Sequence, residues 1–340
     1  MIARLCLALV FLAACMAADV AYAQGRVPPL FDTLANDPLI DDSLEGQSGE
    51  AAPSFDFVES WSEDAPSTAR LMNDEIRIDR FRKGFYQGAE VSAGFLLDTG
   101  NKAGGLDQTF EQARVGFAVP LGSFENILVM QPYFRADHFN GPETIDVPGT
   151  VYDTGVTFFN RKVWSPKISS LAIVTPSVRS DFTTNDGAVR LFGLGLVNWQ
   201  KSDALMCSAG VLYLGRADLP LLPVFGFTYQ PSPTWRFEAM MPRPRIAHRL
   251  WKQGGEAEGW GFFSASIGGN TWAVTRENGQ SDLLTLSEIR LFGGYEVLRP
   301  GGRGYVIEAG LALGRKIEYE RPLTNVSLNN GVFIQAGWQF

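Results

Sequence analysis

The chain has 340 residues, a formal net charge of −8 and a charged fraction of 19%, below the ~25% typical of a soluble globular domain. Outside the N-terminal stretch there is no run of about 18 apolar residues, which excludes helical membrane spans. The sequence contains no basic patch of the kind that binds nucleic acid. The 36 glycines and the 12% aromatic residues are instead typical of a β-barrel with tight turns and aromatic girdles.

The first residues have the pattern of an export signal. Arg4 supplies the positive charge, Leu5 to Ala14 supply the apolar core, and Ala21-Tyr22-Ala23 forms an A-x-A cleavage site, so we expect a signal peptide over residues 1–23. In the alternative interpretation, Leu12-Ala13-Ala14-Cys15 resembles the lipobox of bacterial lipoproteins and Cys15 is acylated. In both cases the protein leaves the cytoplasm.

Residues 24–80 form an acidic segment rich in Pro, Ser and Asp. Thirteen acidic residues stand against four basic ones, which gives this segment a charge of −9 and leaves the rest of the chain near neutrality. Its composition buries too little apolar area to offset the loss of chain entropy, so we expect it to be mostly disordered. The predicted organisation is therefore a signal peptide over 1–23, an acidic segment over 24–80 and a barrel over 81–340.

From Tyr86 onward, apolar and polar residues alternate with a period of two, which predicts β-strands with one apolar face. In the first of these strands, Val91 and Phe95 lie on one face, and Glu90 and Ser92 lie on the other face. Clusters of turn-forming residues separate successive segments. The candidate strands cover residues 86–97, 108–119, 126–138, 150–163, 168–182, 188–201, 204–215, 221–230, 233–241, 258–275, 283–298, 303–319 and 330–340.

These segments predict an all-β fold, a closed antiparallel transmembrane β-barrel. Thirteen candidates conflict with the even strand number of bacterial single-chain barrels, and the alternation of short turns and long loops loses phase at Pro242–Leu250. One strand is therefore false, or one is missed there. We predict about twelve strands, with ten to fourteen allowed. The aromatic residues near turns that we expect to form interfacial girdles are Trp164, Trp199, Trp235, Trp260, Trp272, Tyr295 and Trp338.

The last ten residues alternate clearly, except at Phe333, and end on an aromatic residue. They resemble the C-terminal signal of bacterial outer-membrane β-barrel proteins, in which a polar residue and Gly precede alternating hydrophobic residues that end in Phe. The resemblance implies a location in the bacterial outer membrane, with its lipid and the barrel-assembly machinery as partners, and leaves the oligomeric state open. The residues of this predicted insertion signal are Gly331, Val332, Ile334, Ala336, Trp338 and Phe340.

A second resemblance covers about half of the predicted barrel. Leu221 to Pro231, followed by Trp235 and Met241-Pro242, resembles an uncharacterised family of outer-membrane barrels known as a domain of unknown function. The shared skeleton consists of Pro, Gly and Trp residues. Since that family has no assigned activity, the resemblance implies the fold and adds nothing about chemistry.

Charges of both signs alternate with the apolar faces and are expected to point into the barrel. They could form a lumen whose electric field selects solutes. Alternatively, they could form an interior in which the charges only pair with one another. A twelve-stranded barrel is narrower than the 16–18-stranded porins. The residues predicted to line the lumen are Glu90, Arg114, Arg135, Asp137, Arg236, Glu238, Glu288, Arg290, Glu296 and Glu308.

The segment 242–252 is the one locally basic stretch. Its candidate residues Arg243, Arg245, His248 and Arg249 could fold into the lumen as a constriction loop or contact anionic headgroups. The alternative is an ordinary solvated loop, which two prolines hold extended.

We expect the protein not to be an enzyme. An alternative is an outer-membrane lipid hydrolase, for which His138, next to Asp137 at a strand end, would be the base, but no G-x-S-x-G motif occurs. The two histidines, His138 and His248, lack metal-ligand spacing, so no metal and no cofactor are predicted. A third interpretation is a periplasmic or lipid-anchored β-rich binding protein. The leading prediction is a narrow pore, a transport-type channel or a structural membrane protein.

Overall fold

The computed structural model describes residues 78, 82, 84–100, 104–142, 146–213, 221–240, 243–321 and 323–340. The chain divides into Met1–Leu39, which lies outside the described residues, and Ile40–Phe340, which contains them all. The predicted signal peptide and Cys15 lie outside the described residues, and so does the acidic segment, apart from Ile78. Within the described part of the chain, no helix is long and apolar enough to cross a membrane.

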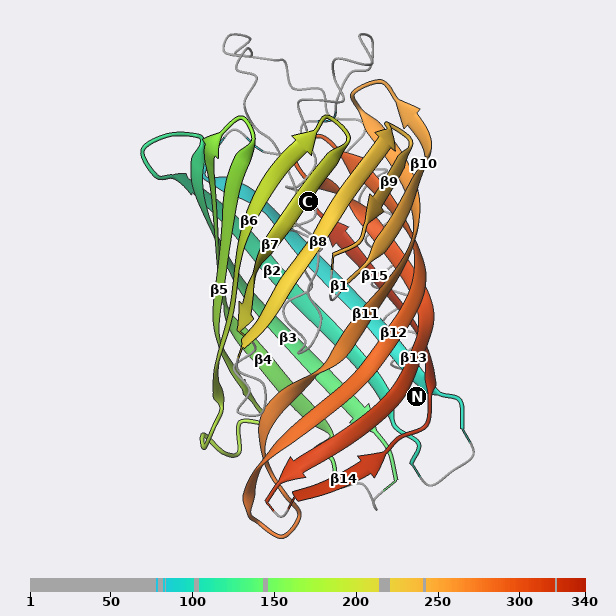
Figure 1. The fold of residues 1–340 in the computed structure, drawn as a ribbon. Helices are drawn as coiled ribbons and strands as arrows, with labels where there is room; N and C mark the ends of the chain where they lie inside the picture. The colour runs from blue at the N-terminus through green and yellow to red at the C-terminus, as the bar shows by residue number, and fades with distance from the viewer. Residues whose placement is uncertain are drawn as a thin grey trace, which may run out of the picture. The chain divides into compact units, whose positions relative to one another are not determined.

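The described residues form fifteen β-strands that alternate in direction along one sheet (Figure 1). Their bounds are β1 Tyr86–Asp98, β2 Asp107–Pro120, β3 Asn126–Asn140, β4 Thr150–Ser165, β5 Ile168–Ser180, β6 Val189–Ser202, β7 Leu205–Tyr213, β8 Leu221–Ser232, β9 Trp235–Glu238, β10 Arg245–Gln253, β11 Ala257–Thr275, β12 Ser281–Arg299, β13 Arg303–Glu320, β14 Leu323–Ser327 and β15 Gly331–Gln339.

The sheet closes on itself. Each strand from β1 to β13 pairs with the next, β13 pairs with β15, and β15 pairs with β1. Strand β14 pairs only with β13, in line with β15, so that the closed ring contains fourteen of the fifteen strands. The predicted class, a closed antiparallel β-barrel, is confirmed. The strand number is higher than the predicted value of about twelve, and it falls at the upper limit of the allowed range.

The sequence pattern missed two strands, β14 outside the closed ring and β10 within it. Strand β10 lies where the predicted alternation of short turns and long loops lost phase, and only nine residues form it. Its inward face carries Arg245 and Arg249 around Ala247, whereas Ile246 and Leu250 are exposed on the other face. A short, arginine-rich strand that follows two prolines has the composition of a loop, although it keeps the period of two.

The two ends of the barrel differ in their connections. Short turns join β2 to β3, β4 to β5, β6 to β7, β8 to β9, β10 to β11 and β12 to β13, and β1 begins and β15 ends at this same end. We call it the short-turn end. The links after β1, β3 and β5 belong to the opposite end and are longer. In Figure 1 this long-loop end, with β14, lies at the bottom.

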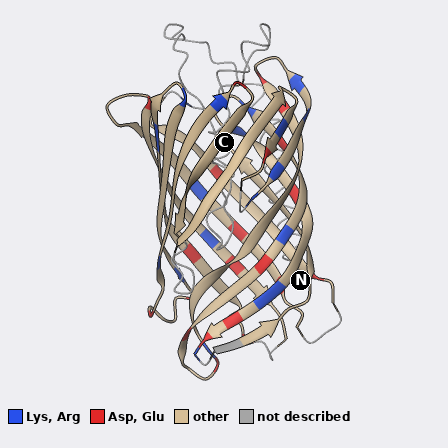
Figure 2. Ribbon diagram, in the orientation of Figure 1, with Lys and Arg blue, Asp and Glu red and all other residues tan. Residues whose placement is uncertain are grey.

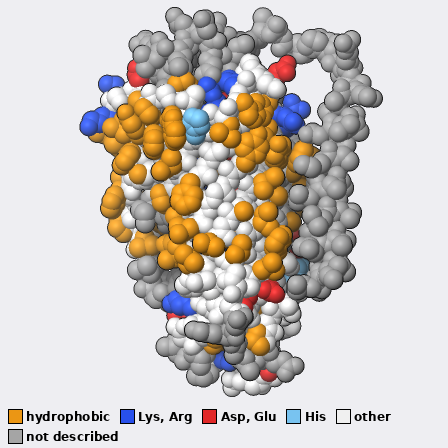
Figure 3. Space-filling view, turned by 90° about the vertical axis from the view of Figure 1, so that its right-hand side faces the viewer, with side chains coloured by type: hydrophobic (Ala, Val, Ile, Leu, Met, Phe, Trp, Pro, Cys, Tyr) orange, Lys and Arg blue, Asp and Glu red, His pale blue; other side chains and the backbone are white. Residues whose placement is uncertain are grey.

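The outer face of the wall is apolar. In β6, Val189, Leu191 and Val197 are exposed, whereas Phe192 and Leu194 between them are buried. Figure 3 shows the resulting belt of hydrophobic side chains on one side of the molecule. The described residues form a single wall, so no second layer of them covers this belt, as the interpretation as a soluble binding protein would require. The fold is a closed antiparallel β-barrel with an apolar outer face.

Aromatic rings gather on the outside near the short-turn end. Trp235 stacks on Phe237 with ring centroids 5.7 Å apart, and Tyr305 stacks on Trp338 at 5.5 Å. These positions agree with an interfacial girdle. Trp260 and Trp272 are exceptions, since both are buried inside the barrel. For these two residues the girdle prediction is wrong.

Strand β15 is the closing strand that the alternation predicted. Ala336 lies opposite Ala93 of β1 and Ile307 of β13. Val332, Ile334 and Phe340 are 45%, 37% and 42% exposed on the outer face, whereas the exception, Phe333, is 3% exposed. Phe333 packs inside against Phe292, with ring centroids 5.8 Å apart. The role of this strand as an insertion signal stays a prediction.

Neighbouring strands change direction at one level near the long-loop end. Gly269 in β11 has φ +115°, and it lies opposite Ser287 of β12. Directly after Ser287 the register between β12 and β13 shifts. Gly314 in β13 has φ +59°. Strands β14 and β15 both pair with β13, and residues 328–330 separate them at this level. We call the part beyond this bend, residues 270–287, 315–321 and 323–327, the flap.

The flap turns across the mouth of the barrel. Ala273 of β11 pairs in parallel with Ser180 of β5, although five strands, β6 to β10, separate β5 from β11 around the ring. Beneath it lies an apolar cluster that includes Trp272, Leu284 and Ile317 of the flap and Phe139 of the wall. Side chains of the flap and of the wall therefore pack together at the long-loop end.

Replacing Gly269 with alanine should destabilise this bend. A φ of +115° is unfavourable for an L side chain and costs about 1–3 kcal/mol, and a Cβ at this position would lie 2.0 Å from the carbonyl oxygen of Leu286. We expect the free energy of unfolding, measured by urea titration in detergent, to fall by at least that amount. Gly195→Ala is the control, because no atom lies within 4 Å of its added Cβ. Equal effects of the two substitutions would contradict the assignment of strain.

Candidate functional site

Ion pairs cross the interior on the short-turn side of the bend. The Arg243 guanidinium donates to Glu308 Oε1 at 3.2 Å, and the side chains are 8% and 2% exposed. Gln335 of β15 donates to the other oxygen of Glu308. Because β11 and β12 separate the start of β10 from β13 around the ring, the Arg243 side chain spans part of the barrel interior. A second pair joins Arg245 to Glu296 at 2.5 Å.

The structure places all ten predicted lumen residues on the buried side of their strands. Glu90 lies 3.7 Å from Arg114, and Arg135 lies 2.7 Å from Asp137. Figure 2 shows charges of both signs along the strands of the wall. The fully buried members are Glu90, Arg114, Asp137, Arg236, Glu238, Glu288 and Glu308, and the partly buried ones are Arg135, Arg290 and Glu296.

The predicted constriction loop is part of the wall. Arg245 and Arg249 belong to β10 and have side chains that are 6% and 11% exposed, the second lying 3.5 Å from Glu258. His248 points to the outside and lies on the Trp235 ring, with centroids 4.4 Å apart. The interpretation as a loop is wrong because β9 and β11 pair with this stretch on both sides. Arg243, directly before β10, remains the candidate for a constriction.

A second polar layer lies under the flap, and sequence reasoning did not single out its members. Asp153 accepts hydrogen bonds from the Tyr133 hydroxyl at 2.8 Å and from Asn270 at 3.2 Å, and it pairs with Arg179 at 3.2 Å. Arg179 also donates to Asn270 at 2.7 Å. Asn270 belongs to the flap, whereas Asp153 and Arg179 belong to β4 and β5. The flap is thus hydrogen-bonded to the opposite wall through buried charged groups.

Glu288 and Arg315 continue this layer at the bend. Arg315 lies 3.2 Å from Glu288, and both side chains are fully buried. Arg290 pairs with the other oxygen of Glu288 at 2.5 Å, and Arg315 donates to the Leu106 carbonyl at 3.0 Å. Three charged side chains therefore meet inside the barrel at this level. The period of two could have indicated that Arg315 points inward, but not which acid it meets.

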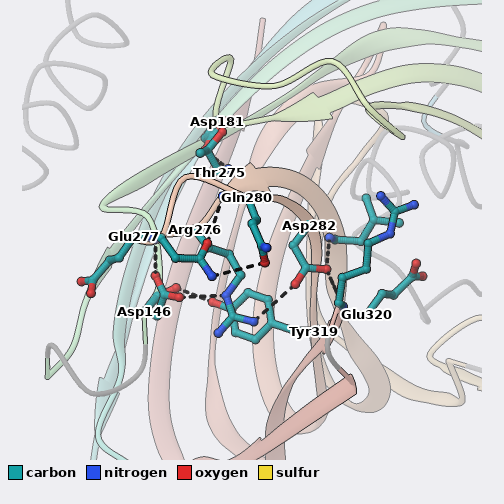
Figure 4. A network of polar contacts seen from close by, with 12 residues as sticks. Asp146, Asp181, Thr275, Arg276, Glu277, Gln280, Asp282, Tyr319 and Glu320 are labelled. Carbon is teal, nitrogen blue, oxygen red and sulfur yellow. Dashed lines mark hydrogen bonds and ion pairs between the residues drawn. The ribbon is translucent and has the colours of Figure 1, made fainter.

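The rim of the flap is held by contacts around Arg276 (Figure 4). Arg276 donates to Asp146 of the β3–β4 link at 2.8 Å and lies over the Tyr319 ring at 4.2 Å. The Glu277 amide donates to the same carboxylate at 3.0 Å, and Thr275 N donates to Asp181 at 2.9 Å. The hydrogen bond to Asp146 raises the pKa of Arg276 above its ordinary value, so the guanidinium stays charged.

His138 has the partners of a catalytic base but lies on the outer wall. One ring nitrogen is 2.9 Å from Thr150 Oγ1 and the other is 2.8 Å from Glu111. Transfer of an acyl group also needs donors for an oxyanion. Strand β3 pairs with β2 and β4 on both sides of His138, so its backbone amides are used in the sheet. We interpret the three residues as a cross-strand hydrogen-bonded cluster.

No protein-family model and no curated protein matches the sequence. Similar solved structures include a mutant of the TodX monoaromatic hydrocarbon channel, with 8% identity, a TM-score of 0.40 and coverage of 80% of this chain and 94% of that one. Another is OprB of Pseudomonas putida, with 10% identity, a TM-score of 0.31 and coverage of 87% and 100%. A mutant porin of Rh. blastica has 7% identity and a TM-score of 0.27 over 74% and 99%.

Proposed function

We propose that the protein is a narrow, transport-type pore of the bacterial outer membrane. The observation that carries this proposal is the Arg243–Glu308 pair, which spans the interior of a closed barrel with an apolar outer face. Such a barrel satisfies its backbone hydrogen bonds within the wall, as a lipid environment requires. In the proposed orientation the short-turn end faces the periplasm, since outer-membrane barrels have short turns there. The barrel-assembly machinery would recognise β15.

The charged residues would line this pore. Because acids and bases alternate and pair, we expect a lumen with weak net preference for either sign of charge, suited to small polar solutes. Arg243 and Glu308 would form the constriction on the short-turn side of the bend. In this role the side chains act through size and hydration, and no covalent chemistry is required.

Replacing Arg243 with alanine should widen the constriction. We expect faster uptake of small sugars in liposome-swelling assays than with the wild type, because the side chain that spans to Glu308 is removed. Lys201→Ala is the control, since Lys201 is exposed in the β6–β7 region and should leave uptake unchanged. Heat-modifiable gel migration would verify that each variant is a folded barrel. Uptake by the folded Arg243→Ala protein that stays at the level of empty liposomes would contradict the pore.

A further inference from the structure

The packing of the flap against the wall at the long-loop end points to a gate. We infer that the flap is a movable gate, which seals the pore in the conformation described above and has to lift from β5 before a solute passes. This inference rests on the proposed function, because a gate has meaning only in a pore. The inference adds to the proposed pore a segment that moves, a hinge about which it turns and the contacts that hold it closed.

The flap is built to move as one unit. Within it, β11 and β12 pair from Asn270–Leu286 to Thr275–Ser281, and β12 also pairs with β13 and β13 with β14, so the flap is held together by its own ladders. Its ladder contact with the opposite wall is a single residue pair, Ala273 with Ser180. Its other polar contacts with the wall are individual hydrogen bonds, such as those of Thr183 with Thr275 at 2.7 Å and of Thr184 with Ser281 at 2.9 Å. The flap can therefore separate from the wall without losing its own ladders.

The hinge lies at the aligned bend of β11, β12 and β13. Gly269 and Gly314 already adopt positive φ values, and the register between β12 and β13 shifts next to Ser287. Glycine changes between backbone regions at little steric cost, and hinges are a few positions that absorb such changes. The three irregularities at one level define an axis about which the flap can turn.

The polar closing contacts are ones that water can replace. At the rim, Arg276 and Asp146 have side chains that are 16% and 23% exposed, so both already touch solvent. Deeper in, Asn270 contacts the charged groups of Asp153 and Arg179, which hydrate well when they are uncovered. The apolar contacts of Trp272 and Leu284 with the wall favour the closed position. Lifting the flap would therefore uncover a polar lining on the wall.

A disulfide between the flap and the wall tests the gate. Ala273→Cys with Ser180→Cys joins residues that are already paired in the sheet, and Cys207→Ser removes the free thiol of Cys207. In the oxidised protein we expect solute uptake to be lost, and a reductant should restore it. Val197→Cys with Ala209→Cys, a paired position on the outside of the wall, is the control and should leave uptake unchanged. Uptake that is present and equal in the oxidised and reduced flap variants would overturn the gate.

Hydrogen exchange separates failure of the gate from failure of the pore. We expect amides of residues 270–275 to exchange more slowly in the oxidised flap variant than in the reduced one, whether or not the barrel conducts. Unchanged exchange, with the disulfide verified on a gel, would show a static plug and overturn the inference. Slower exchange without uptake in any state would retain the moving flap and reject the pore. If the cysteine variant does not fold, Arg276→Gln should raise uptake by loosening the rim, and unchanged uptake would again oppose the gate.

Discussion

Replacing Asp153 with alanine is expected to lower the free energy of unfolding by about 3–5 kcal/mol, the usual effect of removing one partner from a buried ion pair. Asp153 is 1% exposed and Arg179 is fully buried. The substitution leaves the Arg179 guanidinium in the interior without this carboxylate, and it also removes the acceptor of the Tyr133 hydroxyl. Urea titration of the folded barrel, followed by tryptophan fluorescence, measures the change.

Two further variants isolate the charge effect of Asp153. Glu256→Ala removes an exposed acid in a turn and should change stability by no more than about 0.5 kcal/mol. Adding Arg179→Met to Asp153→Ala removes both charges, and the double variant should be more stable than the single one. If Asp153→Ala is as mild as Glu256→Ala, the buried polar layer does not hold the wall together.

Replacing Trp272 with alanine should have two effects. Trp272 is 1% exposed, and its ring packs edge-on against Phe139 with centroids 5.7 Å apart. The cavity left by this change costs about 3–5 kcal/mol. Since the contact with Phe139 joins the flap to the wall, we also expect solute uptake to rise above that of the wild type.

The matched control for Trp272 is Trp199→Ala. Trp199 is 50% exposed on the outer face, so its loss should cost less stability and leave uptake unchanged. Uptake that falls in the Trp272→Ala variant, with the barrel still folded, would contradict a seal formed by the flap. A loss of stability without a change in uptake would restrict Trp272 to a packing role.

The wall of the barrel follows directly from the sequence. A period of two fixes which residues point outward and which point inward, so the outward Val332 and Ile334 and the inward Glu90 and Arg114 were predictable. The ion pairs across the interior were not. Arg243 and Glu308 are 65 residues apart in sequence, and they meet only because the ring closes with a particular number of strands and register.

The flap was also beyond prediction from the sequence pattern. Gly268-Gly269 inside a strand indicates a bulge or bend, but the direction of the bend depends on the strands beside it. Beyond this point both faces of β11 are buried, so the alternation that identifies a wall strand no longer applies. Its position near a turn predicts a place for Trp272 in an outer girdle, whereas it packs under the flap. The missed strand β10 reflects a different cause, its arginine-rich composition.

Single-channel recording of the purified protein in a planar lipid bilayer tests the central claim most directly. A narrow pore closed by a flap predicts discrete conductance steps that occur rarely in the wild type and more often in the Trp272→Ala variant, with larger steps when Arg243 is replaced by alanine. A bilayer that contains folded, inserted protein and stays silent for the wild type and both variants would contradict the account.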